Sequence, residues 1–198
     1  TGVRAQPVSN APSVVNYAFV TPELFAVAAG AHDGSGFDPM LVRWSDQGVN
    51  TTWSPAVTNQ AGDYRLAIGS RIVAGIAAAR ESLILTDRAL YSMRALSDAS
   101  LVYGFTLLGT GCGLIGPNAV TVVGGVAYWL SNNGEFWIYD GGAPRPLPSG
   151  VIDYVFSAIT LAQQEKIYAC RNGLHDEIWW LYPADGNAEN SNYVGYNY

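Results

Sequence analysis

Apolar and polar residues alternate along most of this chain, in short runs that end at Gly, Asn, Asp or Pro. Aromatic and β-branched residues at every second position, with such turn formers between the runs, are typical of half-buried antiparallel strands. The pattern therefore predicts an all-β, antiparallel protein. The expected strands are 24–31, 40–45, 71–79, 82–86, 89–96, 119–125, 126–131, 135–140, 166–171, 177–183 and 192–198.

One segment, 149–166, has a helical period instead of a strand period. Its apolar residues recur every three to four positions, as they do on one face of a helix. We therefore expect one short helix near 151–163. The residues that carry this period are Val151, Ile152, Val155, Phe156, Ile159 and Leu161.

Polar turns recur between the predicted strands at intervals of roughly 40 to 50 residues, a period typical of a β-propeller blade of four short strands. At these turns Gly supplies a positive φ, and Asp or Asn caps backbone N–H groups. We expect a partial propeller of about three to four blades over 24–198, preceded by an extended segment 1–23, in a chain that continues beyond this fragment. A β-sandwich is the alternative. The predicted turn positions are Asp46, Gly48, Asp87, Asn132, Asn133 and Gly134.

Composition narrows the possible functions. The chain is 49% hydrophobic and 13% charged, with 22 Gly, which is typical of a turn-rich globular protein. Its net charge of −6 argues against nucleic-acid binding through a basic face, because that binding needs Lys and Arg to replace counterions. Pro117 and the pair Gly124 and Gly125 interrupt the longest apolar stretch, so we expect no membrane helix. Cys112 and Cys170 lack the neighbours of a zinc site, and we expect neither metal nor cofactor.

Several segments resemble catalytic motifs without completing them. The loop 31–39 holds His32, Asp33 and Asp38, which suit a metal loop, a general base with its orienting carboxylate, or a surface turn. The Gly-rich segment 109–116 has no Lys and leads into a strand, so it does not fit a phosphate loop. His175 has no Ser or Cys nucleophile motif beside it. The sequence therefore predicts a protein that is not an enzyme, with no catalytic, cofactor-binding or metal residues.

The segments 44–53 and 131–137 approximate the Asp-box of sialidase-like propellers, which is a hairpin turn. Sialidase chemistry would also need an arginine cluster and a Tyr–Glu pair, and no spacing in the sequence singles these out. The aromatic residues favour core packing, with a sugar-binding platform as the alternative. These residues are Tyr128, Trp129, Phe136, Trp137, Tyr139, Trp179, Trp180 and Tyr182.

Over residues 40–198 the order of segments resembles virion proteins of tailed bacteriophages, namely the propeller-containing tail nozzle or hub proteins of short-tailed phages. The resemblance is carried by "SLILTDRALYSMRAL", "FTLLGTGCGLIGPNAV", "VAYWLSNNGEFWIYDGGAPRPLP", "VIDYVF" and the aromatic C-terminal segment from "DEIWWLYP" to "NYVGYNY". It is strongest in "GLIGPNAV", in "SNNGEFWIYDG" and in the closing aromatic repeat.

This resemblance implies a structural role in the tail of the virion. Proteins of this kind form homo-oligomeric rings, usually hexameric, that surround the channel for double-stranded DNA and contact other tail proteins such as the adaptor and fibres. An acidic surface suits a channel that does not grip DNA. Nozzle and hub both remain open. The alternatives are a carbohydrate-binding or sialidase-like propeller with exposed residues such as Trp53 or Trp180, or a cellular protein-interaction propeller.

Overall fold

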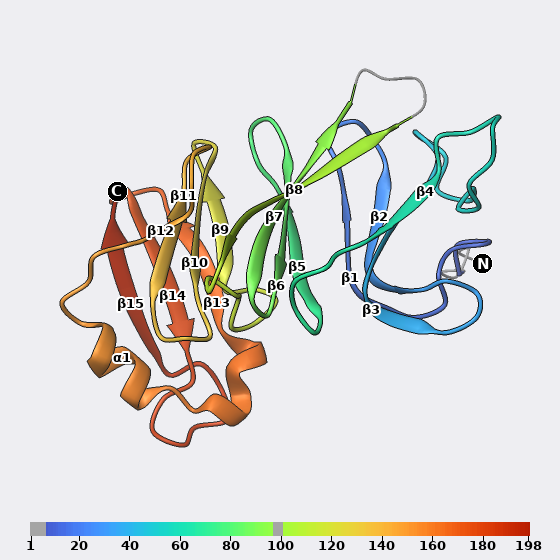
Figure 1. The fold of residues 1–198 in the computed structure, drawn as a ribbon. Helices are drawn as coiled ribbons and strands as arrows, with labels where there is room; N and C mark the ends of the chain where they lie inside the picture. The colour runs from blue at the N-terminus through green and yellow to red at the C-terminus, as the bar shows by residue number, and fades with distance from the viewer. Residues whose placement is uncertain (1–6, 97–100) are drawn as a thin grey trace, which may run out of the picture.

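The computed structural model describes residues 7–96 and 101–198. Antiparallel strands form four separate sheets, and each sheet is built from strands that follow one another in the sequence (Figure 1). The expected all-β, antiparallel class is thus confirmed, and the strands predicted from alternation are present with boundaries shifted by a few residues.

The strands are numbered along the chain. Sheet 1 contains β1 (Val15–Val20), β2 (Ala26–His32), β3 (Phe37–Trp44) and β4 (Gly62–Arg65). Sheet 2 contains β5 (Ile72–Ala77), β6 (Ser82–Thr86), β7 (Ala89–Ala95) and β8 (Tyr103–Thr110). Sheet 3 contains β9 (Val120–Val123), β10 (Val126–Leu130), β11 (Phe136–Tyr139) and β12 (Arg145–Pro146). Sheet 4 contains β13 (Tyr168–Asn172), β14 (Glu177–Tyr182) and β15 (Asn192–Asn197).

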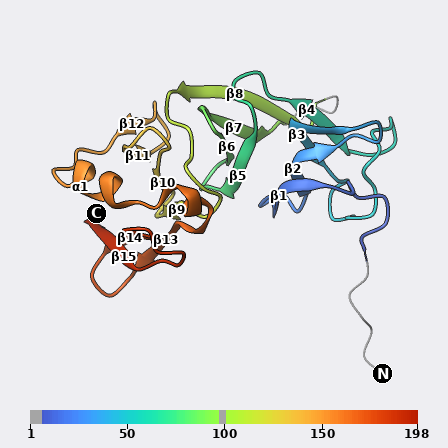
Figure 2. The same cartoon turned by 90° about the horizontal axis from the view of Figure 1, so that it is seen from below.

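The four sheets follow one another along a curve, with the first strand of each sheet on its inner side (Figure 2). Sheets 1 and 2 meet through β1 and β5, where Asn16 Nδ2 donates to the carbonyl of Ile72 at 3.4 Å. Sheets 3 and 4 meet through β9 and β13, where the Ala169 N–H donates to the carbonyl of Asn118 at 2.8 Å. Within the described residues no sheet closes on itself.

Apolar faces between neighbouring sheets form the core. Consecutive residues of β6 point to opposite faces, so Ile84 joins Val42 in a cluster between sheets 1 and 2. Leu85 points to the other face and joins Trp129 and Trp180 in the cluster that connects sheets 2, 3 and 4. Sheet 2 is therefore covered on both faces, which explains why every residue of β6 is buried.

Four strands were absent from the sequence prediction because they lack a long alternating apolar run. β1 is mostly exposed and lies inside the segment 1–23. β4 is polar, β8 is partly exposed and β12 has only two residues, one of them Pro146. Three of these four are the fourth strands of their sheets, where an outer edge demands little apolar burial.

The helix expected near 151–163 is shorter than predicted. Helix α1 spans Ile152–Ala158, and a 3-10 segment, η1, follows at Leu161–Lys166. Between them Ile159 is extended, with φ −59° and ψ 129°, and forms a bridge with Ala184. Ile159 is buried, as the apolar period predicts, but it belongs to this β-bridge and not to the helix. None of the described helices is long and apolar enough to cross a membrane.

The Gly-rich segment 109–116 connects β8 to β9 and passes against the turn between β6 and β7. The Gly111 N–H donates to the carbonyl of Arg88 at 2.8 Å, and the Leu114 N–H donates to the carbonyl of Thr86 at 3.0 Å. Gly113 lies so close to the backbone of Asp87 that a Cβ would overlap it. Gly116 is similarly close to the backbone of Gln164, and Gly111 has φ +74°, so close backbone contact and turn geometry account for these glycines without a phosphate ligand.

We predict that Gly113→Ala lowers the free energy of unfolding by about 1–3 kcal/mol, because the backbones must separate to admit the methyl group. Gly150→Ala is the matched control, since Gly150 faces open space without a positive φ, and its effect should stay within about 0.5 kcal/mol. Urea unfolding followed by tryptophan fluorescence measures both. Equal stability of the two variants would contradict this interpretation.

Candidate functional site

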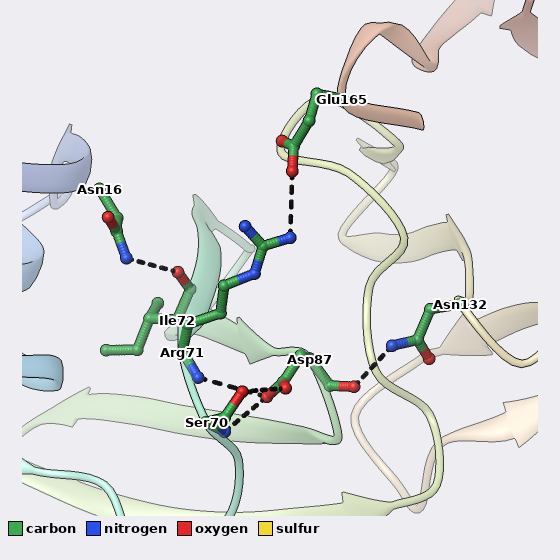
Figure 3. A network of polar contacts seen from close by, with 7 residues as sticks. All are labelled: Asn16, Ser70, Arg71, Ile72, Asp87, Asn132 and Glu165. Atoms are coloured by element: carbon green, nitrogen blue, oxygen red, sulfur yellow. Dashed lines mark hydrogen bonds and ion pairs between the residues drawn. The ribbon is translucent and has the colours of Figure 1, made fainter. Parts of the chain in front are cut away.

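The turn between β6 and β7 is the centre of a polar junction that reaches sheets 1 and 3 and the 3-10 segment η1 that precedes sheet 4 (Figure 3). Its Asp87 carboxylate accepts hydrogen bonds from the Ser70 N–H at 2.8 Å, the Ser70 hydroxyl at 2.5 Å and the Arg71 N–H at 3.4 Å. Ser70 and Arg71 come immediately before β5, so the carboxylate fixes the start of the inner strand of its own sheet. Asp87 therefore acts as a backbone cap, as a turn Asp commonly does.

Neighbouring sheets bind to the same junction. Asn132, in the β10–β11 turn of sheet 3, donates through Nδ2 to the carbonyl of Asp87 at 2.8 Å. Arg71 forms an ion pair with Glu165 of η1 at 3.0 Å, and Asn16 of sheet 1 reaches the carbonyl of Ile72. The junction thus joins sheet 2 to sheets 1 and 3 and to the segment η1, which leads into sheet 4.

The surroundings of Asp87 keep its carboxyl group charged. Burial alone would raise its pKa, but the hydrogen bonds from Ser70 and Arg71 outweigh burial and hold the pKa below the ordinary value. A carboxylate with these acceptor positions occupied is a poor proton acceptor. These contacts give the Asp87 carboxylate a capping role.

The adjacent turn in sheet 3 uses its amides in the same way. Asn133 donates through Nδ2 to the carbonyl of Gly111 at 2.9 Å, and its Oδ1 is hydrogen-bonded to Ser131. Gly134 has φ +86°, a conformation that favours glycine. Asn132 and Asn133 together hold the connection from β8 to β9 between sheets 2 and 3.

Asp46 does not occupy the corresponding position in sheet 1, contrary to the spacing argument. It follows β3, where its Oδ1 accepts from the N–H groups of Gln47 at 3.0 Å and Gln60 at 2.9 Å, while Gly48 has φ +67°. A long connection over residues 45–61 separates β3 from β4 and lengthens the first repeat. The first strands of the four sheets begin at Val15, Ile72, Val120 and Tyr168.

Asp33 is the sheet 1 residue that corresponds to Asp87, because it lies in the turn between the second and third strands. Its Oδ1 accepts from the N–H groups of Gly36 at 2.8 Å and Ser35 at 2.7 Å and from the Ser35 hydroxyl at 2.7 Å. The Gly36 and Ser35 hydrogen bonds lower the pKa of Asp33 to about 2. The sequence showed Asp33 as a loop residue, but spacing alone placed the repeat on Asp46.

The other loop candidates do not converge on one site. His32 Nδ1 accepts from the Gly34 N–H at 2.9 Å, while Asp38 forms an ion pair with Arg65 at 2.6 Å. His175 is exposed in the β13–β14 turn. Across residues 7–96 and 101–198, no group of three or more His, Cys, Asp or Glu side chains could hold a metal ion.

A buried carboxylate that the sequence did not single out connects sheets 2 and 3 at the other end of the strands. Glu81 lies in the β5–β6 turn, and its side chain is only 5% exposed. Tyr139 of β11 donates to Glu81 Oε1 at 2.6 Å, Arg94 of β7 donates through Nε to Oε2 at 3.0 Å, and Ser92 also bonds Oε2. Tyr139 and Glu81 are separated by 58 positions, so no local motif reveals their contact.

Tyr139 and Glu81 form a Tyr–Glu pair, which is one part of the arrangement that sialidase chemistry would require, and Arg94 donates to the same carboxylate. Burial and the Glu81 carboxylate raise the pKa of Tyr139 to about 12, so the phenol keeps its proton. Burial would raise the pKa of Glu81, but the hydrogen bonds from Arg94, Ser92 and Tyr139 outweigh it and lower the pKa. The geometry thus stabilises a charged Glu and a neutral Tyr and does not activate a nucleophile. A cavity of about 390 Å³ lies beside this cluster.

Most of the candidate sugar-platform residues lie in the core. Trp129 and Trp180 are buried, and their indole N–H groups donate to the carbonyls of Cys112 at 2.8 Å and Ala119 at 3.2 Å. Trp53 is buried as well. The sugar-binding alternative expected Trp53 or Trp180 on the surface, and neither is there. Tyr128, Phe136, Tyr139 and Tyr182 are also buried, whereas Trp137 and Trp179 are half-buried.

Neither a protein-family model nor a curated protein sequence matches this chain.

We predict that Asp87→Ala lowers the free energy of unfolding by about 1 kcal/mol through loss of the capping carboxylate. Asp63→Ala on β4 is the matched control, because Asp63 is exposed and makes no side-chain hydrogen bond or ion pair with the described residues. Its effect should stay within about 0.5 kcal/mol. Chemical unfolding measures both variants, and an Asp87→Ala protein as stable as the control would contradict the capping role.

The Glu81 cluster makes stability depend on pH. Because the folded-state pKa of Glu81 lies below the ordinary value of 4.5, its charge contributes stability above that pH. This contribution is lost as the pH falls through the folded-state pKa. We expect the wild type to exceed Glu81→Gln in free energy of unfolding by about 1–3 kcal/mol at neutral pH.

Urea unfolding over a pH series tests this expectation, and the difference should shrink below about pH 4.5. Tyr139→Phe removes one donor to the carboxylate and should move the loss to higher pH. A difference between wild type and Glu81→Gln that does not change with pH would exclude the charge as its cause.

Proposed function

We propose that this chain forms an arc of a β-propeller and serves as a structural subunit in the tail of a bacteriophage virion, in a ring around the path of the ejected DNA. The main support for this proposal is that the first strands of the sheets lie on the inner side of the curve. In a propeller, small sheets stand around a common axis with their first strands nearest to it. The contacts between β1 and β5 and between β9 and β13 follow this arrangement, as does the curve of the four sheets (Figure 2).

The use of polar residues supports a scaffold role. Asp87, Asn132 and Asn133 bind backbone groups of their own or of adjacent sheets, and Glu81 bonds side chains from two sheets. Side chains that form such contacts fix the spacing between sheets. A subunit that must keep its shape while DNA passes needs this rigidity. The proposed role is accordingly not enzymatic.

Net charge supports the same role. The net charge of −6 disfavours binding of a polyanion such as DNA, so DNA would pass without sequence-specific binding. The segments that resemble nozzle and hub proteins lie on β6–β7, β8–β12, α1 and β14–β15. We propose a homo-oligomeric ring, hexameric as in the proteins that these segments resemble, with the adaptor and fibre proteins as neighbours.

Immunogold electron microscopy on density-banded particles of the phage that encodes the chain tests this function. Antibodies against the chain should label the tail end of the virion. Particles labelled on the capsid, or particles that lack the chain by mass spectrometry, would refute the tail assignment.

Carbohydrate binding is the second candidate, and one observation favours it. Trp179 and Tyr193 form an aromatic pair on sheet 4 with ring centroids 4.9 Å apart, and Tyr193 is 61% exposed. Such a pair offers a surface on which a sugar ring can stack. Titration of tryptophan fluorescence with glycans would show saturable quenching if this candidate is correct.

A further inference from the structure

A cavity lies between sheets 2 and 3 at the end of the strands opposite to Asp87. Its volume is about 390 Å³, which is within the range of small-molecule sites. The β5–β6 turn and the β9–β10 turn form two of its walls, and they come so close that a Cβ on Gly125 would lie 2.9 Å from the Cβ of Ala79. The end of β11 and Arg94 of β7 complete the lining. Two sheets therefore contribute polar groups to one small space.

The carboxylates beside this cavity already have partners. Glu81 Oε1 accepts from the Tyr139 hydroxyl at 2.6 Å, and Oε2 accepts from Arg94 Nε at 3.0 Å. Asp140 Oδ2 accepts from Arg145 Nη1 at 2.8 Å. Both negative charges are thus paired with neighbouring arginines, so the cavity offers little to a cation.

Several hydrogen-bond donors at the cavity lack such partners. Arg80 is exposed, and its guanidinium forms no hydrogen bond or ion pair with the described residues. The backbone N–H groups of Gly124 and Gly125 form no hydrogen bond with the described residues either, and these two glycines are consecutive in a turn with φ +59° and +86°. Successive N–H groups in a turn are suited to anions, and a guanidinium matches the geometry of a carboxylate or phosphate. The lining therefore has an excess of donors.

The charge at the cavity has the sign that an anion requires. Among the four charged lining residues, Glu81 and Arg94 pair with each other, Asp140 pairs with Arg145 outside the lining, and Arg80 remains. The chain as a whole has a net charge of −6 and repels anions. An anion therefore needs a place where positive charge is concentrated locally, and the cavity provides one.

We propose that this cavity binds a small molecule that carries a carboxylate or phosphate group. The Arg80 guanidinium supplies the positive charge, and the N–H groups of Gly124 and Gly125 supply neutral donors to the same oxyanion. Ala78 and Val126 in the lining contact the carbon part of the ligand. The bound oxyanion connects the β5–β6 turn to the β9–β10 turn, at the end of the strands where Glu81 and Tyr139 already join the two sheets.

Isothermal titration calorimetry of the full chain tests the site with inorganic phosphate in one series and glucuronate in another, each against chloride at equal ionic strength. At least one of the two anions should bind saturably, at one site per chain. Arg80→Gln should weaken that binding by about tenfold or more, because it removes a charge-assisted hydrogen bond. Arg80 is exposed, so urea unfolding without the anion should show unchanged stability.

Arg88→Gln is the matched control for this variant. Arg88 is exposed in the β6–β7 turn at the opposite end of the strands, and its side chain forms no hydrogen bond with the described residues. The control removes the same charge from the chain, so it separates a local site from an effect of net charge. Its affinity for the anion should equal that of the wild type.

Absence of saturable binding with both anions would overturn the proposal, and so would an equal loss of affinity in Arg80→Gln and Arg88→Gln. Binding of phosphate alone or of glucuronate alone supports the site and identifies its oxyanion. Glucuronate binding that survives Arg80→Gln would place the sugar elsewhere on the chain and refute this site. Labelled virion tails without anion binding would refute the site alone, whereas anion binding with unlabelled tails would refute the tail function alone.

Discussion

A small sheet with apolar residues on a face gains most of its stability when that face is covered, so each sheet of this chain depends on the apolar faces beside it. Residues such as Leu83, Ile84 and Leu85 meet this demand by filling both faces of one strand. Each part of the core therefore lies between sheets that are neighbours along the chain. Removing sheet 2 would expose a face of sheet 1 and a face of sheet 3 at once.

Polar contacts at opposite ends of the strands set the spacing that the apolar faces leave adjustable. Asp87 and Asn132 join sheets 2 and 3 at one end, and Glu81 joins them to Tyr139 at the other. Apolar contacts are not directional, whereas these hydrogen bonds fix both position and angle. The two sheets are therefore held at both ends and cannot slide past each other without breaking these hydrogen bonds.

Much of the fold could be predicted from the sequence because strand alternation is a local property. Regularly placed apolar residues predicted the strands β6, β7, β10 and β14. The edge strand β12 did not, because an exposed pair such as Arg145 and Pro146 carries no such pattern.

Most of the polar junction was beyond sequence reasoning, for the opposite reason. Asp87 was recognisable as a turn residue, but its partner Asn132 is 45 positions away. Glu81 meets Tyr139 across an even longer separation, and Asp46 was chosen over Asp33 because the long connection after β3 hides the repeat. Contacts between distant turns follow from how sheets stack, and one sequence does not record that stacking.

The strict use of consecutive strands in every sheet bears on how the chain is made. Hairpins close short loops, which costs little chain entropy and favours rapid local pairing. On the ribosome, the strands of sheet 1 emerge together and can complete their hydrogen bonds before sheet 2 has been synthesised. Each new sheet can then pack against the apolar face of the sheet that formed before it. The protein can in this way lengthen its core during translation, one sheet at a time, from sheet 1 towards sheet 4.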